Sequence, residues 1–282
     1  VGNYAYVASN EDNGVEILDV SDPSNPTHVG AITDDGTTEL AGAYGIDVVG
    51  NYAYVAGNSD AGVSIVDVSD PTNPTHVGAI TDDGTTELNG AADITVVGDY
   101  AYVAASSDDG VEILDISDPT NPTHVGAITD DGTTELDGAA RIIVVGNYAY
   151  VAAQIDDGLE ILDISDPTNP THAGAITDSA STTLDGALDL FVAGDYAYVA
   201  SASEDSVAVI DISDPTNPTQ VGSITDDGST TLDGPRGIYV QGNYAYVAAT
   251  TDDGVGILEL SGTRTPTLEA GSVLATSLSV DA

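Results

Sequence analysis

Apolar and polar positions along the chain repeat with a fixed period, and turn residues divide each period into short strands. The segment Tyr-Ala-Tyr-Val-Ala recurs every 48 residues, beginning at Tyr4, Tyr52, Tyr100, Tyr148, Tyr196 and Tyr244. Within one period, residues 92–97, 100–104, 111–116 and 123–128 are apolar or β-branched stretches separated by Gly-Asp, Asp-Asp-Gly and Asp-Pro-Thr-Asn-Pro. Such segments are typical of turns. No window has the 3.6-residue apolar period of a helix. We therefore predict four strands per period, named a to d in chain order.

Six periods of this kind predict an all-β fold. Four short antiparallel strands repeated six times at a 48-residue spacing are typical of a six-bladed β-propeller, with residues 1–282 forming one domain. A β-solenoid is the alternative, but a 48-residue coil with three hairpin turns would be unusually wide.

The two ends of the chain suggest how such a propeller closes. The first period begins at strand b, and Leu278-Ser279-Val280 alternates like a strand a. We expect the C-terminal segment to pair beside Tyr4–Ala8 and complete the first blade. Residues 263–282 are irregular, so a linker to further sequence or pairing with another subunit are the alternatives.

Strand c carries a family resemblance. It reads VEILD at 15–19, VSIVD at 63–67, VEILD at 111–115, LEILD at 159–163, VAVID at 207–211 and VGILE at 255–259, each but the last followed by Ser-Asp-Pro. Over residues 1–262 the chain resembles the LVIVD-repeat propellers of bacteria and archaea. The resemblance implies a propeller that is commonly extracytoplasmic or surface-associated, and it implies no defined chemistry. The last period departs from the pattern at residues 262–266.

Composition limits the partners. The chain has three basic residues (Lys and Arg together) and 47 acidic ones, which gives a formal charge of −44. This charge repels phosphate backbones and anionic lipids, so we expect no nucleic-acid binding. No apolar run reaches about 18 residues, so we expect no membrane insertion. Cations are the expected partners. The absence of Lys and the excess of Asp over Glu resemble proteins from saline settings, and we expect an extracellular or cell-surface, halophilic and archaeal or marine protein.

Rare residue types gather at the start of strand a, which lines the central channel of a propeller. We expect a ligand site there, by analogy with other propellers. Arg236 would bind a carboxylate or sugar hydroxyl, and aromatic rings would stack on the ligand. For Arg141, a bridge to flanking carboxylates is the alternative to ligand binding. The full candidate set is Arg236, Arg141, Tyr44, Tyr239, Phe191, Asp47, Asp93 and Asp189.

Paired acidic residues recur in the b–c and d–a loops. Clustered carboxylates suit Ca²⁺, the one cofactor that we consider. Asp-Gly is also a common hairpin turn, so turn formation with diffuse cation screening is the alternative. The candidate ligands are Asp34, Asp35, Asp82, Asp83, Asp108, Asp109, Asp130 and Asp131.

These observations favour a non-enzymatic binding or structural module whose partners include carbohydrate or a surface protein. A repeat unit of a surface layer or filament, self-assembling through the C-terminal segment, is the alternative. A glycosidase using Asp93 and Asp189 is a third hypothesis. The four histidines all fall in the outermost strand d, away from the channel, so we predict no histidine-based metal or nucleophile site at the centre: His28, His76, His124 and His172.

Overall fold

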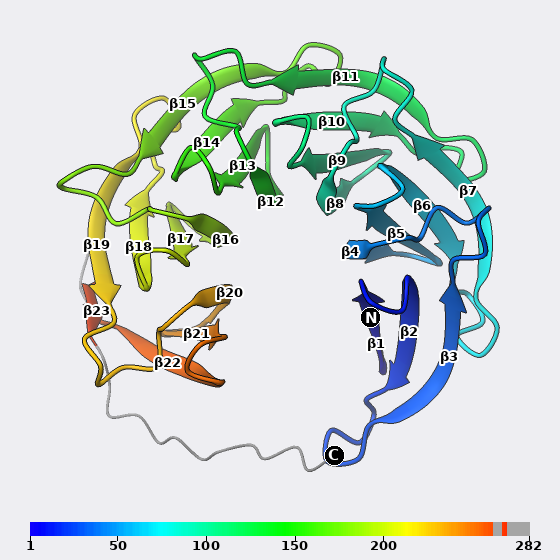
Figure 1. The fold of residues 1–282 in the computed structure, drawn as a ribbon, viewed down its shortest axis with the longest axis horizontal. Coiled ribbons are helices and arrows are strands. Elements are labelled where there is room, and N and C mark those ends of the chain that lie inside the picture. Colours follow the sequence, from blue (N-terminus) through cyan, green and yellow to red (C-terminus); the bar gives the residue numbers. More distant parts are fainter. Residues whose placement is uncertain (262–266, 270–282) are drawn as a thin grey trace. The chain divides into compact units, whose positions relative to one another are not determined.

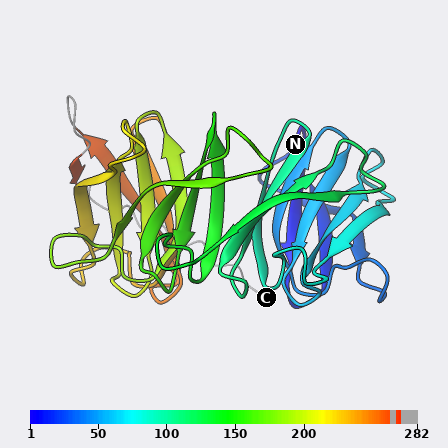
Figure 2. The same ribbon diagram turned by 90° about the horizontal axis from the view of Figure 1, so that it is seen from above.

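A computed structural model describes residues 1–261 and 267–269 of the chain. These residues form 23 β-strands in six antiparallel sheets. Figure 1 labels the strands, and Figure 2 shows from above that neighbouring strands of a sheet run in opposite directions. The described part of the chain has no helix with the length and apolar character needed to cross a bilayer.

Each sheet corresponds to one sequence period and forms one blade. The first blade has three strands and the other five have four, in the order a, b, c, d. The strands of blades 1 to 3 are β1 (Tyr4–Ser9), β2 (Gly14–Asp19) and β3 (Thr27–Thr33); β4 (Ala43–Val49), β5 (Tyr52–Gly57), β6 (Gly62–Asp67) and β7 (Thr75–Thr81); and β8 (Ala91–Val97), β9 (Tyr100–Ala105), β10 (Gly110–Asp115) and β11 (Thr123–Thr129).

Blades 4 to 6 repeat this arrangement. Their strands are β12 (Ala139–Val145), β13 (Tyr148–Ala153), β14 (Gly158–Asp163) and β15 (Thr171–Thr177); β16 (Ala187–Ala193), β17 (Tyr196–Ser201), β18 (Ser206–Asp211) and β19 (Thr219–Thr225); and β20 (Pro235–Gln241), β21 (Tyr244–Ala249), β22 (Gly254–Ser261) and β23 (Thr267–Glu269). The prediction of a six-bladed β-propeller is confirmed, and among residues 1–261 and 267–269 blade 1 contains strands b, c and d only. The predicted closing strand at Leu278-Ser279-Val280 lies outside the described residues.

The chain divides into two compact units, and each is described by itself. The first comprises residues 1–149 and 163–171, and the second residues 150–162 and 172–282. In both units the core lies between facing blades. Tyr54 and Ile65 of blade 2 pack with Ile94 and Val103 of blade 3, and all four are at most 5% exposed. Burial on both faces explains why strands b and c are mainly apolar on both sides.

The turn between strands c and d joins neighbouring blades. A Cβ atom added to Gly126 in β11 would lie 2.5 Å from the Pro167 carbonyl oxygen in the turn of blade 4. Glycine is therefore needed where this turn rests against strand d of the preceding blade. The same approach recurs at Gly30, Gly78 and Gly174. These contacts support the architectural interpretation of the repeated Asp-Pro-Thr-Asn-Pro segment.

Candidate functional site

The variable window at the start of strand a coincides with a break in strand pairing. The register between strands a and b shifts after Ala43 in β4, after Ala91 in β8, after Ala187 in β16 and after Pro235 in β20. Such a β-bulge leaves an unpaired residue and turns its side chain away from the regular alternation. Two candidate residues, Tyr44 and Arg236, fall within these bulges, and both side chains are exposed.

In the second unit, β20 carries Arg236 in its bulge and, three residues later, one ring of an aromatic pair. Ile238 and Val240 of β20 are buried in the core shared with blade 5, so the alternate residue Tyr239 faces outward and is 53% exposed. The ring of Phe191 in β16 meets the Tyr239 ring edge to face, with centroids 5.1 Å apart. Arg236 has no ion pair or hydrogen bond from its guanidinium to any residue that the structure describes.

The acidic candidates of strand a join neighbouring blades. Asp47 Oδ2 accepts a hydrogen bond from the Val96 amide at 2.8 Å, and Asp93 Oδ2 accepts one from the Ile142 amide at 2.9 Å. In the second unit, Asp189 Oδ2 accepts a hydrogen bond from the Ile238 amide at 2.7 Å. Each carboxylate therefore satisfies a main-chain amide of the following blade.

Arg141 pairs with one of these carboxylates. Its Nη1 donates to Asp93 Oδ1 at 3.1 Å, and Asp93 is only 4% exposed. A buried carboxylate needs a positive partner and further hydrogen bonds, and Asp93 has both. This geometry agrees with the carboxylate-bridge interpretation of Arg141. It also leaves Asp93 engaged on both oxygens, which does not suit a glycosidase acid.

Most of the proposed calcium ligands are hydrogen-bonded within their own loops. Asp34 and Asp35 accept hydrogen bonds from the Gly36 and Thr37 amides and from the Thr37 and Thr38 hydroxyls. Asp82 and Asp83 repeat this pattern. The Thr37 hydrogen bonds hold the pKa of Asp35 below its usual value. Asp130 accepts a hydrogen bond from the Gly132 amide, and Asp131 accepts one from the Thr133 amide.

The b–c loop carboxylates hold the start of strand a. Asp108 Oδ2 accepts from the Asn89 amide of its own blade at 2.7 Å, and Asp109 Oδ1 accepts from the Gly138 amide of the next blade at 3.1 Å. Within residues 1–261 and 267–269, no three His, Asp or Glu side chains come together as a set that could hold a metal ion. Calcium binding stays a prediction, and its candidate ligands have turn-forming roles here.

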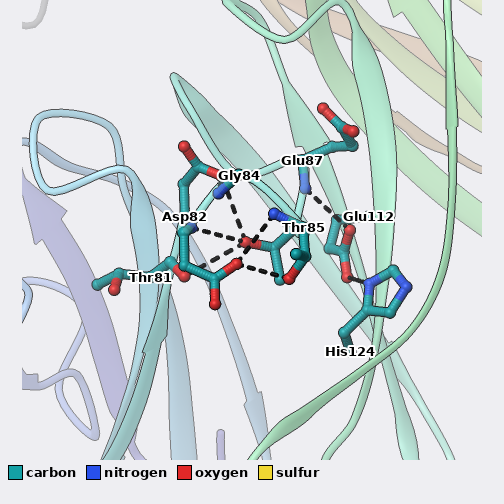
Figure 3. Close-up of polar contacts among 9 residues, drawn as sticks. Thr81, Asp82, Gly84, Thr85, Glu87, Glu112 and His124 are labelled. Atoms are coloured by element: carbon teal, nitrogen blue, oxygen red, sulfur yellow. Dashed lines mark hydrogen bonds and ion pairs between the residues drawn. The ribbon is translucent and has the colours of Figure 1, made fainter.

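One group of buried polar side chains was missed by the sequence reasoning. Glu112 in β10 is completely buried, and its Oε1 lies 2.5 Å from His124 Nδ1 in β11 (Figure 3). Its Oε2 accepts a hydrogen bond from the Glu87 amide at 3.0 Å. Burial raises the pKa of Glu112, while the Glu87 amide and His124 act in the opposite direction.

The Glu112 pair has equivalents in two other blades. Glu160 lies 2.6 Å from His172, and Glu16 contacts His28. The signal was present in the sequence, since a glutamate in strand c accompanies a histidine twelve residues later in three periods. The histidines do lie in strand d as predicted, and there His124 and His172 each contact a buried glutamate.

Comparisons with solved structures show the fold. The chain is similar to a protein from Lactobacillus plantarum, with 16% identity, a TM-score of 0.80, and coverage of 95% of this chain and 80% of the other. It is also similar to the periplasmic gluconolactonase of Pseudomonas aeruginosa, with 13% identity, a TM-score of 0.74, and coverage of 92% and 78%. For virginiamycin B lyase of Staphylococcus aureus the values are 11%, 0.65, 91% and 76%.

Sequence comparison identifies the repeat itself. No curated protein sequence matches the chain. The model of the LVIVD repeat matches residues 1–34, 42–82, 90–130, 138–178, 186–226 and 235–268, which is one match for each blade. The chain therefore belongs to the LVIVD-repeat family.

Proposed function

We propose that this propeller is a non-enzymatic binding module, displayed outside the cell in a saline environment, with its ligand at the strand-a face of the second unit. The ligand contacts are Arg236, Tyr239 and Phe191. Arg236 carries the proposal. It is an exposed guanidinium in a chain with 47 acidic residues, yet no carboxylate among the described residues pairs with it.

The chemistry of these side chains suits an acidic carbohydrate. A guanidinium binds a carboxylate through two parallel hydrogen bonds, and it also binds vicinal hydroxyls. The exposed Tyr239 ring offers an apolar face to a sugar ring, and its edge-to-face contact with Phe191 restricts its rotation. A fixed ring loses little conformational entropy when a ligand binds.

The other candidate residues of strand a have different roles, and one of them positions the proposed site. Asp189 holds the Ile238 amide, so it positions the strand that carries Arg236 and Tyr239. In the first unit, Tyr44 is 57% exposed within its bulge and offers a separate aromatic surface, whereas Asp47, Asp93 and Arg141 hold neighbouring blades together.

A screen of acidic and neutral glycans tests the proposal. We expect the chain to retain uronic-acid glycans, and Arg236→Ala to reduce their binding at least tenfold, because the charge-assisted contact is lost. Gln241→Ala is the matched control, since Gln241 is exposed on the same strand. Equal binding by Arg236→Ala and the control would contradict the assignment.

The enzymatic alternative is tested directly. Two structural neighbours are named as a gluconolactonase and a lyase, at 13% and 11% identity. We expect no hydrolysis of gluconolactone above the uncatalysed rate, because Asp93 and Asp189 are engaged by main-chain amides. Purified wild-type protein that hydrolyses gluconolactone, together with an inactive Arg236→Ala variant, would contradict the binding function. It would indicate catalysis at the same face.

A further inference from the structure

Two asparagine–glycine sequences occur in the chain, Asn13-Gly14 and Asn89-Gly90. In such a sequence the amide nitrogen of the glycine can attack Cγ of the asparagine and close a succinimide ring, because glycine has no side chain to obstruct the attack. In a folded protein the reaction depends on whether the asparagine side chain and the attacking amide are free to meet. These two groups are held differently at the two sequences.

The amide of Gly90 lacks the acceptor that its equivalents have. In four other blades the glycine before strand a donates its amide to a side-chain oxygen in the b–c loop of the preceding blade; these pairs are Gly42 with Asn13, Gly138 with Asp109, Gly186 with Asp157 and Gly234 with Asp205. The loop residue that corresponds for Gly90 is Ala61, which shares the left-handed conformation, with a φ of 52°, but has no side-chain oxygen. The Gly90 amide therefore has no acceptor within the described part of the chain, and no hydrogen bond has to break before it attacks.

The peptide group between Asn89 and Gly90 is polarised by its neighbours. The Asn89 carbonyl oxygen accepts hydrogen bonds from the amides of Ser107 at 3.1 Å and Asp108 at 3.2 Å. When Gly90 loses its amide proton, negative charge moves onto this oxygen, and the two donors stabilise it as in an oxyanion hole. Gly90 is buried, whereas the Asn89 side chain is exposed and makes no hydrogen bond to a residue that the structure describes. That side chain can therefore turn toward the amide and meet water.

Asn13 is the opposite case in the same chain. Its Oδ1 accepts the Gly42 amide at 2.8 Å, so the side chain is held to the next blade. Gly14 begins β2 and is paired with both neighbouring strands of its sheet. Acidic neighbours accompany both asparagines, Asp12 here and Asp108 in the other loop, so local charge does not favour either one. The difference lies in the hydrogen bonds.

We propose that Asn89 is a deamidation site that the fold itself activates. The Gly90 nitrogen bonds to Cγ of Asn89, the Cγ–Nδ2 bond breaks, and ammonia leaves with the proton of the Gly90 amide. Water then opens the succinimide at either carbonyl, which gives aspartate or isoaspartate at position 89. The fold accommodates the aspartate, since the equivalent residues of blades 4 to 6 are Asp137, Asp185 and Asp233. The reaction is independent of the proposed ligand site.

Peptide mass spectrometry after incubation of the folded chain in mildly alkaline buffer tests this site. Cleavage after glutamate releases residues 12–16 and 88–112, and each of these peptides contains one asparagine. Deamidation makes a peptide heavier by one mass unit. We expect residues 88–112 to gain this mass about tenfold faster than residues 12–16, because only Asn89 has a free side chain, a free amide and a polarised carbonyl. In the denatured chain the two peptides should react at similar rates.

A substitution in the neighbouring loop makes the result specific. Ala61→Asp restores the acceptor that the other blades have, so we expect it to slow the reaction of Asn89 several-fold and leave Asn13 unchanged. Ala61→Gly adds no acceptor and should keep the wild-type rate. If Ala61→Asp does not fold, Ala61→Asn takes its place, since Asn13 serves as the acceptor in blade 1. Equal rates at the two asparagines of the folded chain overturn the proposal, and so does an unchanged rate at Asn89 in the variant with the restored acceptor.

Discussion

The carboxyl groups of this protein have opposite pKa shifts, according to what surrounds them. Asp115 accepts hydrogen bonds from Ser117 in an exposed turn, and these hydrogen bonds lower its pKa. Glu112 is buried, and burial raises its pKa despite the contact with His124. A raised pKa in the folded state means that folding favours the protonated carboxyl, and a lowered pKa means that folding favours the carboxylate.

The two residues therefore have opposite effects on the pH dependence of stability. The stabilising contribution of Glu112 is present below its unfolded pKa and is lost as the pH rises through its folded pKa. We expect Glu112→Gln to gain free energy of unfolding relative to the wild type between pH 4 and pH 7, measured by urea denaturation. The contribution of Asp115 is present above its unfolded pKa and is lost as the pH falls through its lowered folded pKa, so Asp115→Asn should be the less stable chain above about pH 5 and should approach the wild type below about pH 4. A difference from the wild type that does not change with pH, in either variant, would contradict the assignment for that residue.

Neighbouring blades are joined by short polar and steric contacts in addition to their apolar cores. The carboxylate of Asp93 links β8 to the Ile142 amide of β12, and the turn at Pro167 lies against Gly126 of β11. The carboxylate contact comes from the variable window of strand a, whereas the turn contact recurs at Gly30, Gly78 and Gly174. Removing either contact should lower the free energy of unfolding, and each effect can be traced to one interaction.

The carboxylate link can be tested by shortening its side chain. We expect Asp93→Ala to lower the free energy of unfolding by about 2–3 kcal/mol, because a buried amide loses a charged acceptor and Arg141 loses its partner. Asp93→Asn should lose less, since its oxygen still accepts from Ile142. Asp99→Ala, in an exposed turn, is the control and should stay within about 0.5 kcal/mol of the wild type.

The turn contact can be tested by adding one carbon atom. We expect Gly126→Ala to cost about 1–3 kcal/mol, because the new methyl group would meet the Pro167 carbonyl oxygen and force the turn away. Ala127→Ser, at the next and partly exposed position, should be close to neutral. Chemical denaturation of both variants gives the comparison, and a neutral Gly126→Ala would mean that the turn moves freely.

Much of this element-level structure could be predicted from the sequence. The strands predicted at 100–104 and 111–116 are observed at Tyr100–Ala105 and Gly110–Asp115, because turn residues bound each apolar stretch. The bulges at the start of strand a could not be predicted, since they depend on pairing with strand b. The windows of variable residues were found, but periodicity does not distinguish a carboxylate that binds ligand from one that holds an amide.

At the scale of the whole molecule, the formal charge of −44 opposes folding through mutual repulsion. The loop carboxylates reduce this cost locally by accepting hydrogen bonds from main-chain amides, as Asp108 and Asp109 do. Dissolved ions screen the long-range repulsion between these carboxylates.

Salt should therefore stabilise the protein. We expect the melting temperature to rise by several degrees, about 5 °C or more, between 0.1 and 2 M NaCl, because screening weakens the repulsion between carboxylates. A parallel series in CaCl₂ at matched ionic strength tests the calcium prediction. A larger rise in CaCl₂ supports specific binding, equal rises reject it, and a fall in NaCl would contradict the role of repulsion.

The turn at Pro167 and the glycine at 126 also bear on how such a chain can change in length over evolution. Blades 2 to 5 each carry a turn that rests on the blade before it, and blades 1 to 4 each carry the glycine that receives the turn of the next blade. Both halves of the junction are therefore copied whenever one 48-residue period is duplicated. A tandem duplication adds a blade whose junctions already fit, so the number of blades can vary in this family without the invention of a new interface.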